Sequence, residues 1–384
     1  MKGLKLTVIR RFATAAAAAF VLLFSVSVSV SALDVSAKGM VLMNADTGEI
    51  LASKNAHLRL SMASTTKLMT ALLLAETGTP EKTVVTTKQM VTVEGSSMGL
   101  LEGDQVSYHA LLAGMMLSSG NDAANTTAIA VAGSVDKFVQ MMNDRAEQIG
   151  MTNTHFVTPS GLDDDEHYST AYDMALLAVE ALKNKYLAFA AASRTMTVSY
   201  GSPPYDRTLT NHNKLLGSYD GCIGLKTGFT KKSGRCLVSA ARRNGCTVVA
   251  VTLCDPDDWD DHRALLDYGL GCLEPVDVTY KFEDNTIPVA GGDADRVRIA
   301  TGQYICGCTA ASKERVTGIL RILPFVYPDV SPGRIVGYVD YTYDNRVIRT
   351  EPVYALGDVK YKNVNKSFSD KVKDNLLNLT GLLK

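Results

Sequence analysis

The stretch G-L-K-T-G-F-T at residues 224–230 carries the most information about how this chain folds. Its centre, Lys226-Thr227-Gly228, is the last of three short motifs. Ser64-Thr65-Thr66-Lys67 comes first and Ser119-Gly120-Asn121 second, so S-x-x-K, S-x-N and K-T-G follow one another in that order. A second S-x-x-K at 134–137 predicts an ordinary helix N-cap, so the first motif alone means little. All three motifs in this order are far less expected by chance.

The first motif predicts a nucleophile and its base. Ser64 and Lys67 share a helix face if a helix begins near Ser64, because residues three apart are neighbours. The segment 67–75 is rich in helix formers and almost continuously apolar, which predicts a buried helix. A serine at such a start lies where backbone N–H groups stabilise negative charge. Lys67 can remove its proton only if burial or a second cation lowers its pKa, and Lys226 is the candidate cation.

The second motif interrupts a strongly apolar stretch at 111–132 and predicts a tight turn between two buried helices. In a structural interpretation, Ser119 and Asn121 cap the second helix. In a functional one, Ser119 relays a proton to a leaving amine and the Asn121 amide binds a peptide carbonyl. The residues alone leave both interpretations open.

The third motif predicts an edge strand. Glycine at this position lets an extended peptide approach the backbone and add to the sheet as a further strand. Thr227 and Lys226 then offer a hydroxyl and a charge to a free carboxylate. The structural alternative is a simple turn between strands.

With these residues the chain resembles the D-alanyl-D-alanine carboxypeptidases, the low-molecular-mass penicillin-binding proteins of bacterial cell walls. The likeness also includes Gly161-Leu162, the segments 167–175 and 234–238, and Leu265 to Gly269, so it covers nearly the whole chain. It implies removal of the terminal D-alanine from peptidoglycan stem pentapeptides through an acyl-enzyme, without a cofactor or metal. β-Lactam antibiotics are then expected to acylate the same serine.

The resemblance also implies a role for each motif residue. The implied catalytic residues are Ser64, Lys67 and Ser119. The implied substrate-binding residues are Asn121, Lys226, Thr227 and Gly228. The implied oxyanion hole consists of the backbone N–H groups of Ser64 and Phe229. Some relatives have histidine where this chain has Phe229. Phe229 still provides the backbone N–H donor, but its side chain changes the finer contacts with the substrate.

The N-terminus predicts export. Residues 1–32 have a basic start, an apolar core at 13–24 and small residues at Val30-Ser31-Ala32, which is typical of a secretory signal peptide. The alternative is an uncleaved membrane anchor. We therefore expect an extracytoplasmic protein, peripheral on the outer face of the cytoplasmic membrane. A formal charge of −1 without dense Lys/Arg runs argues against a nucleic-acid partner.

The seven cysteines are an odd number, and no cysteine–histidine spacing is typical of a zinc site. They are Cys222, Cys236, Cys246, Cys254, Cys272, Cys306 and Cys308. Because a large domain does not need disulfides, we expect mostly free, buried thiols.

The expected fold is α+β, with a penicillin-binding/β-lactamase-like catalytic domain at 33–274 and a β-sandwich at 275–362. Asp46-Thr47-Gly48 and Arg243-Asn244-Gly245 predict hairpins, and helices are expected over most of 64–187 and again at 259–270. In the second domain, strands are predicted at 276–282, 297–300, 334–343 and 347–350.

The last segment, 363–384, predicts an amphipathic helix. Its apolar residues recur at helical spacing: Phe368, Val372, Leu376, Leu379 and Leu383. In relatives such a helix lies on the membrane surface, and here it predicts weak, reversible binding. A helix packed on the β domain and a frayed terminus are the alternatives.

Three rival functions share part of this sequence pattern. A β-lactamase shares the motifs but usually has an E-x-x-L-N loop, which is absent between Asn121 and Lys226. A D,D-endopeptidase would use the same active residues to cut peptide crosslinks. A non-catalytic penicillin-binding sensor or scaffold would not need a complete set of catalytic residues.

Overall fold

The structure is a computed structural model and describes residues 33–362. The predicted signal peptide at 1–32 and the predicted tail helix at 363–384 lie outside these residues. Among the residues described, no helix combines the length and the apolar character that a bilayer crossing needs.

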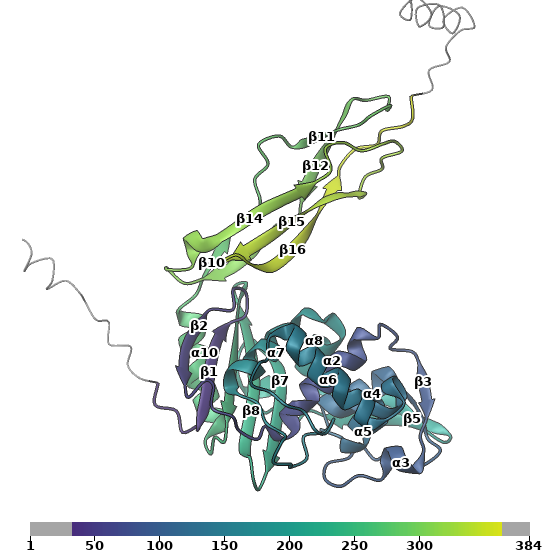
Figure 1. Ribbon diagram of the computed structural model, residues 1–384, viewed down its shortest axis with the longest axis vertical. Coiled ribbons are helices and arrows are strands. Elements are labelled where there is room, and N and C mark those ends of the chain that lie inside the picture. The colour runs from purple at the N-terminus through teal and green to yellow at the C-terminus, as the bar shows by residue number, and fades with distance from the viewer. Residues whose placement is uncertain (1–32, 363–384) are drawn as a thin grey trace, which may run out of the picture. The chain divides into compact units, whose positions relative to one another are not determined.

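A five-stranded antiparallel sheet forms the centre of the first part of the chain, in the order β2-β1-β9-β8-β7 (Figure 1). Its strands are β1 (Gly39–Asn44), β2 (Ile50–Lys54), β7 (Cys222–Thr230), β8 (Gly234–Arg243) and β9 (Cys246–Leu253). Both predicted hairpins of this sheet are confirmed. Asn244 and Gly245 have φ angles of 52° and 84°, the left-handed pair that a two-residue hairpin turn requires. β7 is an edge strand, as the third motif predicts.

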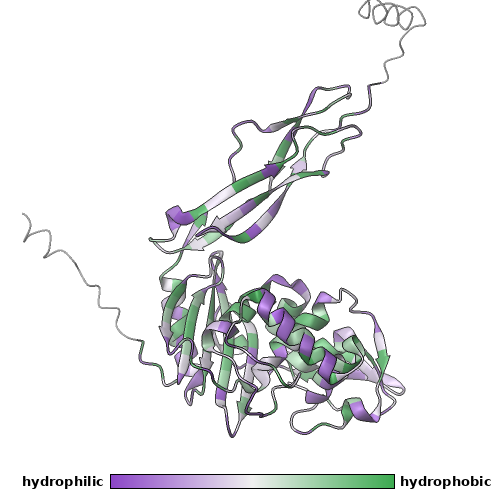
Figure 2. Cartoon of the chain, viewed as in Figure 1, coloured by the Kyte–Doolittle hydropathy of each residue, from purple (hydrophilic) through white to green (hydrophobic). Residues whose placement is uncertain are grey.

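Helices cover this sheet. α7 (Ala171–Lys183) and α10 (Asp258–Gly271) both contact β9, and every residue of β9 is buried. The other helices are α2 (Lys67–Glu76), α3 (Lys88–Val91), α4 (Tyr108–Met116), α5 (Asn121–Ala132), α6 (Val135–Ile149), α8 (Lys185–Ala192) and α9 (Leu215–Ser218). Figure 2 shows hydrophobic residues concentrated in the central strands. α2 is the predicted buried helix, and α10 the predicted closing helix.

Sequence reasoning missed a second, four-stranded sheet in the first part. It consists of β3 (Thr83–Val85), β4 (Gln105–Ser107), β5 (Thr195–Gly201) and β6 (Pro204–Thr210). Tyr200 of β5 donates a hydrogen bond to the carbonyl of Met98, and Arg207 of β6 donates one to that of Gly99. This sheet therefore holds the loop that precedes the second motif.

From β10 onward the described chain is almost entirely β and has its own core. A five-stranded sheet has the order β11-β12-β16-β15-β14, and β10 pairs with β13. The elements are β10 (Glu274–Asp277), β11 (Thr286–Pro288), β12 (Arg296–Thr301), β13 (Ile305–Cys308), a 3-10 turn η2 (Lys313–Arg315), β14 (Val316–Ile322), β15 (Ile335–Tyr343) and β16 (Arg346–Ala355). Cys306 of β13 packs in one apolar cluster with Val339 and Val353 of the larger sheet. The expected α+β fold with a C-terminal β-sandwich is confirmed, although β11, β13 and β14 were not predicted.

All seven cysteines lie within the described residues, and none forms a disulfide. Cys236, Cys246, Cys306 and Cys308 are buried, and the other three are half-buried. Over residues 33–362, no group of three His, Cys, Asp or Glu side chains is placed to hold a metal ion.

Candidate active site

Ser64 lies in a 3-10 turn, η1 (Ala63–Thr66), that leads directly into α2. The preceding Ala63 has a φ of 47°, a left-handed conformation that is unfavourable for a residue with a Cβ atom. The Nζ of Lys67 donates hydrogen bonds to the Oγ of Ser64 at 2.8 Å and to the carbonyl oxygen of Ser160 at 2.7 Å. The amine therefore lies within proton-transfer distance of the hydroxyl, as the spacing predicts.

Two buried lysines meet at this site, and the pKa of each is lowered. Burial lowers the pKa of Lys67 well below its ordinary value of 10.5, and the charge of Lys226 lowers it further, while Asp122 acts in the opposite direction. Burial lowers the pKa of Lys226 to about 7. The second cation that the sequence predicts is therefore close enough to act on Lys67. A buried lysine with a lowered pKa has a populated neutral form that can accept a proton.

The second motif forms the predicted tight turn between α4 and α5. Ser119 has a φ of 55°, and the N-cap position of α5 is Gly120, without a side-chain capping bond. The interpretation that Ser119 and Asn121 cap this helix is therefore wrong. The Nδ2 of Asn121 donates to the carbonyl of Glu94 at 2.6 Å, and its buried Oδ1 has no hydrogen-bond partner within residues 33–362. The amide thus retains one N–H and its oxygen for a ligand.

Asp122, directly after the second motif, holds the preceding loop against this turn. Asp122 is buried, with only 1% of the residue exposed. It accepts hydrogen bonds from the Oγ of Ser97 (2.6 Å) and from the backbone N–H groups of Met98 (2.9 Å), Gly99 (3.0 Å) and Leu100 (2.9 Å). These donors replace the water that the carboxylate loses on burial. Sequence reasoning missed this residue. Its position as an acidic side chain at the start of an apolar helix could have indicated a role for it.

The third motif brings the edge strand β7 close to η1. A Cβ atom added at Gly228 would lie only 3.0 Å from the backbone nitrogens of Ser64 and Thr65, so glycine permits this approach. The main chain next to Phe229 and the backbone nitrogen of Ser64 are therefore neighbours, as two donors to one oxyanion must be. Thr227 is half-buried, and its carbonyl accepts a hydrogen bond from the Nζ of Lys226 at 2.9 Å. The side chain of Phe229 is exposed.

His167 supports the first motif, and sequence reasoning gave it no individual role. Its Nδ1 accepts a hydrogen bond from the backbone N–H of Val157 at 2.9 Å, so its Nε2 carries the proton and donates to the Oγ1 of Thr66 at 2.8 Å. Burial lowers the pKa of His167 to about 4, so the ring is neutral at neutral pH. Its neutral form links η1 to the loop that contains Ser160.

Gly161 lies in the same loop and is required for its close contact with η1. Its φ is 84°, and a Cβ atom there would lie 1.9 Å from the carbonyl oxygen of Ala63. A side chain at this position would therefore displace the backbone next to Ser64.

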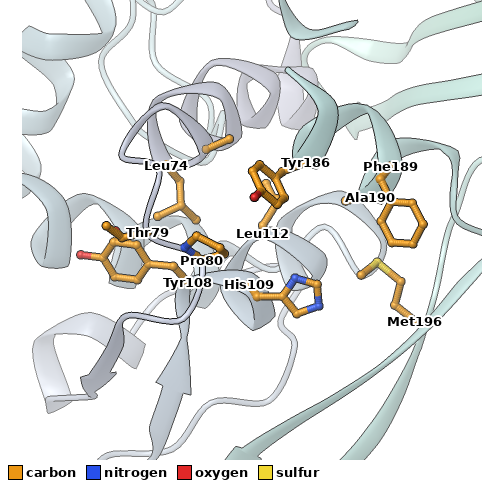
Figure 3. A pocket seen from close by; sticks show the side chains of 11 residues that line it. Leu74, Thr79, Pro80, Tyr108, His109, Leu112, Tyr186, Phe189, Ala190 and Met196 are labelled. Atoms are coloured by element: carbon orange, nitrogen blue, oxygen red, sulfur yellow. The ribbon is translucent and has the colours of Figure 1, made fainter. Parts of the chain in front are cut away.

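A separate apolar hollow lies between α2, α4, α8 and β5 (Figure 3). Leu74, Leu112, Phe189 and Met196 contribute to its walls. None of the residues of the three motifs lines it. This hollow is therefore distinct from the site around Ser64.

A serine hydroxyl paired with a buried lysine on an α+β scaffold defines the class of serine acyl-transferring enzymes. The family described as D-alanyl-D-alanine carboxypeptidase matches residues 26–257. The chain belongs to this family, so the resemblance that the motifs indicate is confirmed.

The relatives of this chain include carboxypeptidases and an endopeptidase. The D-alanyl-D-alanine carboxypeptidase DacF of Bacillus subtilis is 30% identical over 84% of this chain and 86% of its own length. A D-alanyl-D-alanine endopeptidase of Pseudomonas aeruginosa is 33% identical over 54% of this chain and 68% of its own length. The crystal structure of the D-alanyl-D-alanine carboxypeptidase DacD from Francisella tularensis matches with a TM-score of 0.62 at 25% identity, covering 88% of this chain and 97% of that one.

Proposed function

We propose that this protein is a serine-type D-Ala-D-Ala carboxypeptidase that removes the terminal D-alanine from peptidoglycan stem pentapeptides. The observation that carries the proposal is the 2.8 Å hydrogen bond between the Nζ of Lys67 and the Oγ of Ser64, made by a fully buried lysine of lowered pKa. In this proposal Ser64 is the nucleophile and neutral Lys67 is its base.

The chemistry then proceeds in two stages. The Oγ of Ser64 attacks the carbonyl carbon of the penultimate D-alanine while its proton passes to the Nζ of Lys67. The backbone N–H groups of Ser64 and Phe229 bind the oxyanion that forms. The C–N bond breaks, and Ser119 relays a proton to the leaving amine of the terminal D-alanine. Water then hydrolyses the ester on Ser64 and releases the shortened peptide.

The substrate is held by the second and third motifs. Asn121 binds a peptide carbonyl through the N–H that its contact with Glu94 leaves available. The substrate lies along β7, where Gly228 allows its close approach, and Thr227 and Lys226 bind the terminal carboxylate. In a β-lactam the broken amide belongs to a ring, so the leaving nitrogen stays attached to the acyl group on Ser64.

We also propose the organisation of the whole chain. Residues 1–32 are a signal peptide, 33–274 the catalytic domain, 275–362 a β-sandwich and 363–384 a helix that binds the membrane surface. These assignments rest on the basic and apolar start, the change to β-rich sequence near Pro275 and the helical spacing after Asn365. The enzyme would then act outside the cytoplasm, peripheral to the membrane.

The test compares two substrates. Release of D-alanine from a stem pentapeptide is measured beside cleavage of a crosslinked peptide dimer, with Ser64→Ala as the inactive control. We expect fast D-alanine release and slow dimer cleavage. Faster dimer cleavage would instead support the D,D-endopeptidase. Acylation by penicillin without turnover of either peptide would support a non-catalytic sensor.

A further inference from the structure

One end of the C-terminal β region exposes a group of large apolar side chains. β14 ends at Ile322 where it pairs with Gly337, and Ile335 at the start of β15 pairs with Tyr354 near the end of β16. The segments after β14, before β15 and after β16 therefore meet at this end. The exposed apolar residues there, which we call the apolar tip, are Leu323, Phe325, Tyr327, Ile335, Leu356 and Tyr361.

The backbone of the apolar tip is held by hydrogen bonds. Arg334 donates to the carbonyl oxygens of Tyr327 at 3.0 Å and Asp329 at 2.7 Å. The carboxylate of Asp329 accepts the backbone N–H of Tyr361 at 3.1 Å, and Val330 pairs with Val359. These bonds join the loop between β14 and β15 to the last described residues. The apolar side chains are therefore presented by a fixed backbone.

The aromatic residues of the tip are of the kind found at an interface between an apolar phase and water. Tyr327 is 64% exposed and Tyr361 70% exposed, and the rings of Phe325 and Tyr327 meet edge to face at 5.3 Å. Tyrosine combines an apolar ring with a polar hydroxyl, which is why it is enriched at membrane–water interfaces. Large apolar side chains that gather in exposed positions at one end of a soluble domain mark an interaction surface.

The position of the tip in the chain identifies the partner. The described chain ends at residue 362, one residue beyond Tyr361, and the remaining residues 363–384 have the apolar spacing of a membrane-surface helix. Chain continuity therefore keeps the tip close to any surface that binds this segment. Nearby charges have both signs, with Asp358 paired to Lys360 at 3.2 Å, so the contact does not depend mainly on anionic lipid.

We propose that the apolar tip is a second membrane contact, which inserts its aromatic and aliphatic side chains into the interface of a lipid bilayer beside the C-terminal segment. This inference rests on the proposed extracytoplasmic, membrane-peripheral location. Two adjacent contacts bind more strongly than either alone, because the first raises the effective concentration of the second.

Tryptophan fluorescence tests the contact directly in the mature chain, residues 33–384. The single native tryptophan is removed by Trp259→Phe, and Phe325→Trp then places a probe in the tip. With vesicles containing brominated phosphatidylcholine, we expect the emission to shift to the blue and to be quenched. The matched control is Tyr205→Trp in the same background, at an exposed aromatic position of β6, which should show neither change. Unchanged Phe325→Trp emission on vesicles that sediment the protein would overturn the proposal.

A second measurement separates the tip from the catalytic assignment. We expect the triple variant Leu323→Ser, Phe325→Ser, Tyr327→Ser to lower vesicle partitioning by about tenfold or more, since three apolar side chains no longer leave water. The matched control replaces three exposed apolar residues of the first part with serine: Leu101, Phe189 and Tyr205. Equal partitioning of the two triple variants would overturn the proposal. D-Alanine release in solution should be unchanged in the tip variant, so its absence in the parent chain would count against the proposed function alone.

Discussion

Both parts of the molecule carry ion pairs on their surfaces, but among the described residues only the first part buries charged side chains. The first part buries several of them, including Lys67, Asp122 and Lys226, and also keeps His167 and His262 inside. The pKa values of both histidines and both lysines are lowered by burial. In the β region, by contrast, ion pairs such as Arg321–Asp340 and Arg296–Asp284 lie on the surface.

This difference indicates that the buried lysines serve catalysis, whereas the surface ion pairs contribute little to either catalysis or stability. Burying a charge without full compensation is unfavourable, and the two lysines kept in that state, Lys67 and Lys226, both belong to the motifs around Ser64. Surface pairs remain screened by water and contribute little. We therefore expect substitutions of the buried lysines to change catalysis greatly, and substitutions of the surface pairs to change neither catalysis nor folding much.

The largest expected effect comes from Lys67→Arg. This variant keeps a positive charge, but a guanidinium cannot lose a proton in a protein, so the base is lost. Acylation by penicillin should fall by roughly 10²-fold or more, the usual scale for removing a general base. Lys137→Arg, in the other S-x-x-K sequence, is the matched control and should acylate at the parent rate. Rapid acylation of Lys67→Arg would mean that charge, rather than proton abstraction, is what the lysine provides.

The next effect concerns the substrate carboxylate. Converting the terminal carboxylate of the pentapeptide to an amide removes a charge-assisted hydrogen bond to Thr227 and Lys226. The stabilisation of the transition state should fall by about 1.5–3 kcal/mol. It is measured from the ratio of kcat/KM for D-alanine release from the acid to kcat/KM for D-alaninamide release from the amide. Equal values for acid and amide would favour the endopeptidase alternative.

A smaller effect should appear in the pH dependence of acylation. The reaction needs neutral Lys67, so its rate falls as the pH drops through the pKa of this group. The charge of Lys226 helps to lower that pKa, so Lys226→Gln should raise it and move the acid limb of the profile to higher pH. The measurement is the rate of penicillin acylation across pH for parent and variant. An acid limb that stays in place or moves to lower pH would contradict the coupling of the two lysines.

The smallest effect is expected in the β region. Arg321→Ala removes the ion-pair partner of Asp340 on the exposed face of β14 and β15 and leaves its hydrogen bond from Thr350. Because such pairs are screened by solvent, the urea midpoint should move little and the acylation rate should not change. A large loss of acylation would show that the β region influences the active site and would remove the contrast between the two parts.

Features encoded by neighbouring residues could be predicted from the sequence. Asn244-Gly245 specifies its hairpin through local turn chemistry, and the apolar segment after Lys67 specifies a buried helix. The spacing of Ser64 and Lys67 predicts their hydrogen bond for the same reason. The order of the three motifs then identifies the family.

Features that arise from tertiary contacts could not be predicted in this way. Asp122 binds the backbone of Met98 across a loop, and His167 reaches Thr66 from a distant segment, so no local pattern assigns them a role. β3 and β4 are only three residues long, too short for a clear alternation of apolar and polar residues. The capping interpretation of Ser119 failed because the chain adopts a left-handed conformation there instead.

If Ser64 is the nucleophile, it is the residue that penicillin acylates. The direct test is to label the protein with penicillin, digest it and locate the added mass by tandem mass spectrometry. We expect a single penicilloyl adduct on the peptide that contains Ser64, and none in Ser64→Ala. An adduct on Ser134, or undiminished labelling of Ser64→Ala, would contradict it.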